Sequence, residues 1–166
     1  MKAFSSSGYL LGNARLEVRL VYTGFLVLVS LGLATMAIAQ VAHYGLTPSA
    51  IAIAVRGGER GGVMVFEKTF RELIELTHFH AFSMAVVYLI LAHLIIATRA
   101  PGWVKRGSIV LGFAGLTGDI AGLWLVRYAS PRFAWLELAA WLAEWSAFVS
   151  FVVFPVWDMW VLGPAL

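Results

Sequence analysis

Four histidines are the side chains of this sequence best suited to hold a ligand, and three of them lie in one apolar stretch. His78, His80 and His93 fall within residues 72–99, a run long enough to cross a bilayer, and His43 precedes it. Ionisable side chains inside a membrane segment are costly and usually functional. Imidazole nitrogens bind metals, form hydrogen bonds and transfer protons. We therefore expect a partner for these side chains elsewhere in the chain.

The apolar surroundings of the histidines are a property of the whole chain. Of its 166 residues, 61% are hydrophobic and 13% are charged, whereas soluble domains are about 45–50% apolar and about 25% charged. A core of this size cannot hide so much apolar surface, so lipid must cover part of it. A span needs about 20 residues, which predicts four spans in a single transmembrane domain, residues 1–166.

The predicted fold is an all-α, integral-membrane four-helix bundle with both termini on the same side. Apolar runs and the turn residues between them predict spans at about 19–43, 72–98, 104–128 and 133–160. The long loop 44–71 contains Pro48 and several glycines, which break helices. Within this loop, residues 49–55 suit a short surface helix or strand.

Carboxyl groups inside the predicted spans are the candidate partners of the histidines. With a rise of about 1.5 Å per residue, His78 and His80 lie about 9–12 Å into their span from the side of the long loop. On the same scale Asp119 lies about 12 Å deep, and Glu137 and Glu144 about 6 and 16 Å deep. His43 lies at the end of its span on that side. Every span thus contributes a polar group to one half of the membrane, and we take this layer as the candidate site.

The histidines of the second span do not act as one unit. His93 lies about 20 Å deeper than His80, outside the layer. At about 100° per residue, His78 and His80 point in different directions, so they are not expected to bind one metal together. One of them is expected to be a ligand, and the other to pair with Asp119 or Glu144.

Haem of the b type is one cofactor that suits this layer. His43 and one of His78 and His80 would be axial ligands, and Asp119 or Glu144 would orient an imidazole by accepting its second N–H. The pair His80 and His93, thirteen residues apart on one helix, together with His43, resembles small four-helix membrane cytochromes of the b type. That resemblance implies haem b and a role in electron transport.

Other functions use the same residues. The layer suits a quinone head group or a proton relay. A single metal ion held by His43, by His78 or His80, and by Asp119 or Glu144 is chemically allowed. Alternatively, the chain is a cofactor-free accessory subunit in which buried polar pairs fix the helix register. No set of nucleophile, base and orienting group is visible, so a catalytic role of its own is not expected.

The sequence also excludes several classes of site. Without cysteine it has no disulfide, thiolate metal site or covalently attached haem. No basic run or phosphate loop supports nucleic-acid binding. Basic residues dense in the short segment 99–106 favour cytoplasmic termini, in a bacterial inner membrane. The predicted function is a membrane subunit of an electron-transfer complex, in contact with other membrane or extracytoplasmic subunits.

Two packing predictions concern helix surfaces. Ala114, Gly118 and Gly122 repeat every four residues, which predicts close contact between helices. Trp141 and Trp145 lie deep in the fourth span, and we expect them to face lipid.

Overall fold

The computed structural model describes residues 9–163, which form helices, two 3-10 turns and one small hairpin. In chain order the elements are η2 (Leu11–Asn13), α1 (Leu16–Tyr44), α2 (Pro48–Arg56), β1 (Gly58–Arg60), β2 (Val63–Val65), α3 (Phe70–Ile96), α4 (Gly102–Tyr128), η3 (Pro131–Phe133) and α5 (Ala134–Trp160).

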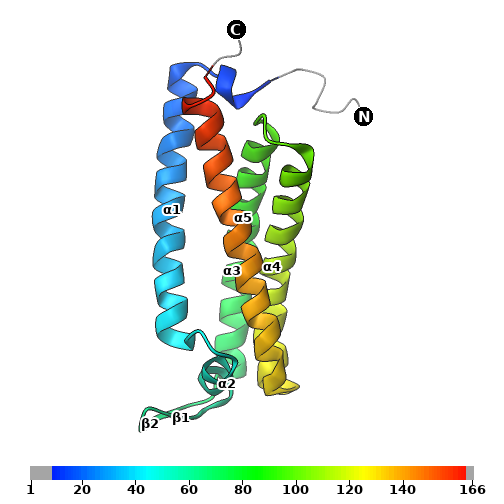
Figure 1. Ribbon diagram of the computed structural model, residues 1–166. Coiled ribbons are helices and arrows are strands. Elements are labelled where there is room, and N and C mark those ends of the chain that lie inside the picture. Colours follow the sequence, from blue (N-terminus) through cyan, green and yellow to red (C-terminus); the bar gives the residue numbers. More distant parts are fainter. Residues whose placement is uncertain (1–8, 164–166) are drawn as a thin grey trace.

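Four of these helices, α1, α3, α4 and α5, are long and apolar enough to cross a membrane. They run side by side along one axis, with α2 and the hairpin at one end and the described ends of the chain at the other (Figure 1). The prediction of an all-α membrane bundle with both termini on one side is therefore confirmed. Within the described residues, the hairpin is the only β-structure of the bundle.

Most of the core comes from α3, α4 and α5. Along α4, glycines let α5 approach so closely that an added Cβ at Gly115 would lie 3.0 Å from the Ala140 carbonyl oxygen. At Gly118 it would lie 3.1 Å from the Ala140 Cβ. The prediction of close helix contact is confirmed for Gly118 and Gly122, whereas Ala114 is exposed. The buried stripe continues instead through Gly115 and Gly112.

Helix α1 lies at the edge of the bundle, beside α5 (Figure 1). Of its residues, only Leu26 and Leu33 are buried. Apolar side chains such as Val21, Leu28 and Ile38 are about two-thirds exposed, at 68%, 70% and 70%. In a membrane, lipid or a partner chain covers such a surface.

The connection between α1 and α3 is more ordered than its glycines indicate. Thr47 caps α2 by accepting a hydrogen bond from the Ala50 N–H at 3.2 Å, and Pro48 occupies the first turn. Ile51 and Val55 are fully buried, so α2 is not a surface element but closes one end of the bundle. Gly61 and Gly62, with φ of +59° and +80°, make the turn of the hairpin.

Candidate functional site

A cavity of about 320 Å³ lies at the end of the bundle that α2 closes. All four membrane helices contribute to it, and we call it the loop-side cavity. Its lining residues are Met36, Ala39, Gln40, His43 and Tyr44 of α1, Leu76 and His80 of α3, Asp119 and Leu123 of α4, Glu137 and Trp141 of α5, and Lys68.

The two imidazoles of the cavity come from different helices. His43 is exposed in the last turn of α1, and His80 is half-buried in α3. The Nδ1 atom of His80 lies 3.0 Å from the Leu76 carbonyl oxygen one turn earlier. That carbonyl accepts a hydrogen bond from Nδ1–H, which leaves Nε2 of His80 available to another group.

The other two histidines lie elsewhere. His78 is exposed on α3 and does not line the cavity. His93 is also exposed, and its Nδ1 lies 2.7 Å from the Leu89 carbonyl oxygen. The structure thus brings His43 and His80 together and leaves His78 and His93 outside.

Asp119 of α4 is held by α5. Its Oδ1 accepts a hydrogen bond of 2.8 Å from the indole N–H of Trp141, and both side chains are buried. The expectation that Trp141 faces lipid is therefore wrong: Trp141 is 5% exposed. Its indole ring also meets the Tyr44 ring edge-on, with centroids 6.0 Å apart. The indole N–H explains the burial, because it needs an acceptor and Asp119 supplies one.

The two glutamates of α5 differ in their relation to the cavity. Glu137 lines it, although the residue is fully buried. Glu144 is also buried, at 2% exposed, but lies two turns further along α5 and packs its Cγ against Gly115. Of the predicted layer, Asp119 and Glu137 face the cavity directly, and Glu144 lies behind them.

Lys68 is the cationic group of the cavity, and its position depends on the folding of the connection. Its backbone N–H donates to the Val55 carbonyl at 2.9 Å, and its carbonyl accepts from Nε of Arg127 at 2.8 Å. The ammonium then lies 5.3 Å from the centroid of the Tyr44 ring. A loop residue 24 positions beyond Tyr44 gives no local signal of this contact, so neither Lys68 nor Tyr44 was predicted from the sequence to line this cavity.

Within residues 9–163, no three His, Cys, Asp or Glu side chains are grouped so that they could together hold a metal ion. The arrangement of the cavity is suited instead to hydrogen bonding. It offers imidazole, ammonium, amide and phenol donors beside carboxyl acceptors and aromatic walls.

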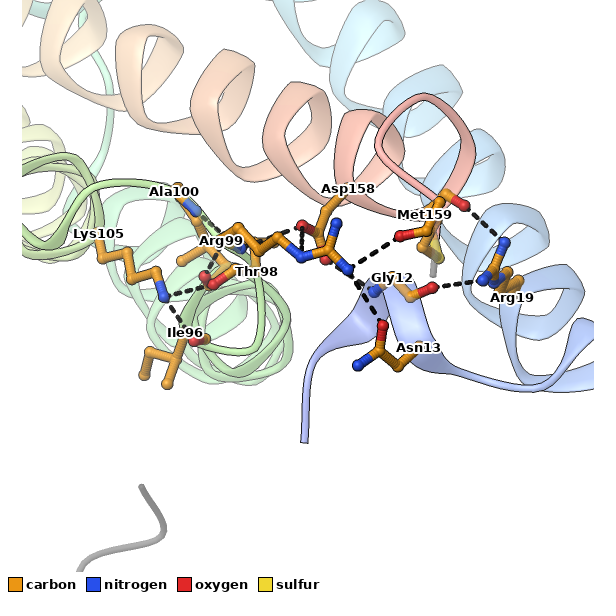
Figure 2. A network of polar contacts seen from close by, with 12 residues as sticks. Gly12, Asn13, Arg19, Ile96, Thr98, Arg99, Ala100, Lys105, Asp158 and Met159 are labelled. Atoms are coloured by element: carbon orange, nitrogen blue, oxygen red, sulfur yellow. Dashed lines mark hydrogen bonds and ion pairs between the residues drawn. The ribbon is translucent and has the colours of Figure 1, made fainter. Parts of the chain in front are cut away.

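A second polar cluster lies at the opposite end of the bundle (Figure 2). Buried Asp158 of α5 accepts hydrogen bonds from the backbone N–H of Gly12 at 2.7 Å and of Arg99 at 3.1 Å. Its Oδ1 also lies 3.8 Å from Nε of Arg99. Arg19 donates to the carbonyls of Met159 and Gly12. We call Gly12, Arg19, Arg99 and Asp158 the terminal clamp.

The terminal clamp has a structural explanation. It joins η2, the turn between α3 and α4, and the end of α5, and the Gly12 N–H, the Arg19 guanidinium and the Arg99 N–H and Nη2 all donate to backbone carbonyls or side-chain oxygens. Asp158 was not among the predicted site residues, although an Asp in the last turn of an apolar helix indicates that a donor lies near it.

One comparison places the chain among known proteins. Residues 45–165 match the model of the Aq_1264_TM family, which describes a transmembrane helical domain. No curated protein and no solved structure matches the chain. The match runs from the end of α1 through α5, and so includes His80, Asp119 and Glu137. The chain therefore belongs to the Aq_1264_TM family of transmembrane helical domains.

Proposed function

We propose that this chain is a small integral-membrane subunit of an electron-transfer complex and that its loop-side cavity binds a quinone head group. The proposal rests on one observation: His43, His80 and Lys68 line a single cavity inside a membrane bundle. The aromatic rings of Tyr44 and Trp141 line the same cavity. A quinone ring presents two carbonyl oxygens, which need donors, and two faces, which pack against aromatic rings. Imidazole and ammonium supply such donors.

An apolar groove supports a ligand with a hydrocarbon tail. The α1–α5 groove has a volume of about 250 Å³ and is lined by Ser30, Leu33, Ala34, Trp145, Phe148, Val149, Val152 and Val153. It follows the cavity along both helices: Trp145 is one turn beyond Trp141, and Leu33 is one turn before Met36. A polar end followed by an apolar groove favours a lipid-soluble quinone over a small water-soluble anion.

The head-group proposal is tested by titrating the full chain in nanodiscs with a short-tailed quinone while tryptophan fluorescence is recorded. We expect saturable quenching, weakened about tenfold in His80→Ala, because one hydrogen bond of about 1.4 kcal/mol corresponds to that factor. His78→Ala is the matched control, since it removes an exposed histidine two residues away. Equal losses in both variants, or no saturation in the native chain, contradict the proposal.

The tail is tested separately. Ala34→Trp fills the α1–α5 groove, and we expect it to weaken a long-tailed quinone while leaving a short-tailed one unchanged. Leu31→Trp places the same side chain at an exposed position of α1 outside the groove and is the control. If both quinones respond equally to Ala34→Trp, the groove does not hold the tail.

Haem b is the second candidate for the same cavity. The observation in its favour is that one imidazole from α1 and one from α3 line a single space, with Nε2 of His80 available. His43 and His80 would be its axial ligands, and bound haem would supply one-electron transfer. An absorption spectrum of the purified chain tests it: if haem binds, a Soret band is present that His43→Ala and His80→Ala abolish and His93→Ala retains, and a spectrum without that band contradicts haem. A chain that binds neither haem nor quinone would be a structural accessory subunit.

A further inference from the structure

Three buried carboxyl groups follow one another along the interface of α4 and α5. Glu137 and Glu144 are seven residues apart on α5, so they lie on the same face of the helix. Each packs against a glycine of α4. Oε2 of Glu137 would clash with a Cβ added at Gly122, and Cγ of Glu144 lies 2.7 Å from the position that a Cβ would take at Gly115. Asp119 comes between these glycines. We call Asp119, Glu137 and Glu144 the carboxyl row.

Three of the six oxygens of the carboxyl row, both of Glu137 and Oε1 of Glu144, are buried without a well-formed hydrogen bond among the described residues. Asp119 lies one turn of α4 from each of the two glycines against which the glutamates pack, and its carboxyl group is near enough to Glu137 to share a proton with it. Three carboxyl groups this close in a buried interface cannot all be ionised, so the row holds exchangeable protons.

A fourth unpartnered group lies at the inner end of the row. The hydroxyl of Tyr88 is buried and has no hydrogen-bond partner among the described residues. The Tyr88 ring packs on Gly112 of α4, one turn from the Gly115 against which Glu144 packs. The Tyr88 ring stacks on Phe148 with centroids 4.9 Å apart and meets Phe151 edge-on at 6.0 Å. These aromatic rings cannot accept the Tyr88 proton, whereas a carboxylate of the row can.

The outer end of the row opens into the loop-side cavity, which both Asp119 and Glu137 line. The titratable groups around the row come from α1, the segment before α3, α3, α4 and α5. They are His43 and Tyr44 on α1, Lys68 before α3, His80 and Tyr88 on α3, Asp119 on α4, and Glu137 and Glu144 on α5. On the far side of Tyr88 the core continues with Leu91, Ile95 and Phe151, which cannot carry a proton.

We propose that the carboxyl row is a proton path that joins the loop-side cavity to Tyr88 in the interior of the bundle. In each step the O–H bond of one protonated carboxyl group breaks as an O–H bond forms on a neighbouring carboxylate. At the inner end the Tyr88 hydroxyl passes its proton to the Glu144 carboxylate and takes one back, so protons are exchanged there and none is delivered. At the outer end Glu137 exchanges its proton with water in the cavity, and no electron moves. Side-chain rotation or a bridging water closes the gaps between neighbours.

A purely structural role explains the row less well. Buried polar pairs that fix helix register satisfy each other's hydrogen bonds. Here Trp141 satisfies one oxygen of Asp119, whereas Glu137 makes no well-formed hydrogen bond on either oxygen and has only the Asp119 carboxyl group and the Trp141 indole within reach. The row also connects two different environments, the cavity at one end and the unpartnered phenol at the other. The path does not require that a quinone bind, so the path and the proposed function can be tested independently of each other.

Infrared spectroscopy of the full chain in nanodiscs tests the path, because a protonated carboxyl group absorbs at a different frequency from a carboxylate. We expect a protonated-carboxyl band that Glu144→Gln removes and that shifts when H₂O is replaced by D₂O. Asp119→Asn should slow that shift about tenfold, since the amide keeps the Trp141 hydrogen bond but cannot relay a proton. If Glu144→Gln removes no such band, the proposal is overturned.

A second variant keeps the test decisive if Asp119→Asn does not fold. Ala39→Trp plugs the cavity from α1, where Ala39 is exposed and loosely packed, and should slow the exchange of the Glu144 band. Ala42→Trp, at an exposed position outside the cavity, should leave the rate unchanged. Exchange that Ala39→Trp does not slow shows that protons reach Glu144 by another way and overturns the path.

Discussion

The hydrogen bond between Trp141 and Asp119 ties α5 to α4 at the level of the cavity. Its 2.8 Å length and the burial of both partners mean that neither has water as an alternative. We expect Trp141→Phe to lower the free energy of unfolding by about 1–3 kcal/mol, the cost of leaving a buried acceptor unpaired. Thermal unfolding in detergent micelles, followed by circular dichroism, measures it.

Trp145→Phe is the control for this substitution. Trp145 is half-buried one turn further along the same helix, and its indole has no hydrogen-bond partner among the described residues. We expect a smaller loss of stability there. An equal loss in both variants would mean that ring volume, and not the hydrogen bond, stabilises this part of α5.

At the residue scale, depth along the helices was the useful information in the sequence. Counting the rise from each span end predicted that His43, His80 and Asp119 lie at a common level, and the structure arranges these three around one cavity. Counting could not decide between His78 and His80, because that choice depends on how α3 is rotated against its neighbours. The position of Lys68 could not be predicted for another reason: Lys68 reaches the cavity only through the tertiary contacts of a loop.

Among the elements, the glycines of α4 determine how near α5 can lie. A Cβ at Gly115 would meet the Ala140 carbonyl oxygen and the Glu144 backbone nitrogen, both at 3.0 Å. Backbone atoms cannot move aside as a flexible side chain can. We therefore expect Gly115→Ala to destabilise the bundle by about 1–3 kcal/mol through overpacking, measured by unfolding in detergent.

Gly107→Ala provides the comparison on the same helix. Nothing lies within 4 Å of a Cβ added at Gly107, and alanine favours helix over glycine. This variant should be neutral or slightly more stable than the native chain. Destabilisation of similar size at both positions would contradict this account, because α5 does not reach Gly107 and helix propensity favours alanine at both sites.

At the element scale the four long helices were predictable because each contains an uninterrupted apolar run of membrane length. The small-residue pattern also predicted that α4 would pack closely, although it placed Ala114 in the stripe where Gly115 belongs. The burial of helix α2 was harder to predict from the sequence. Its nine residues are too few for a periodic pattern to distinguish a surface helix from one whose Ile51 and Val55 are buried.

For the whole molecule, the terminal clamp joins segments that are far apart in sequence. Asp158→Ala removes the acceptor for Gly12 and Arg99 and leaves the Arg99 guanidinium without its carboxylate. We expect a loss of about 3 kcal/mol and faster proteolysis of the segment before α1. Limited proteolysis with mass spectrometry measures the second effect.

Glu75→Ala is the control for the clamp. Glu75 also forms an ion pair, with Arg71, but both side chains are exposed and such pairs contribute about 0–1 kcal/mol. If Asp158→Ala changes neither stability nor proteolysis beyond this control, the clamp does not hold the two ends of the chain together.

Photolabelling tests the location of the proposed quinone site most directly. A quinone carrying an azide on its ring, activated by light in nanodiscs that contain the full chain, attaches to the residues it touches. We predict labels on residues that line the loop-side cavity, among them His80 and Trp141, and protection of these residues by excess unlabelled quinone. Labels confined to lipid-facing positions such as His78 and Phe79, or labels that excess quinone does not reduce, would contradict the account.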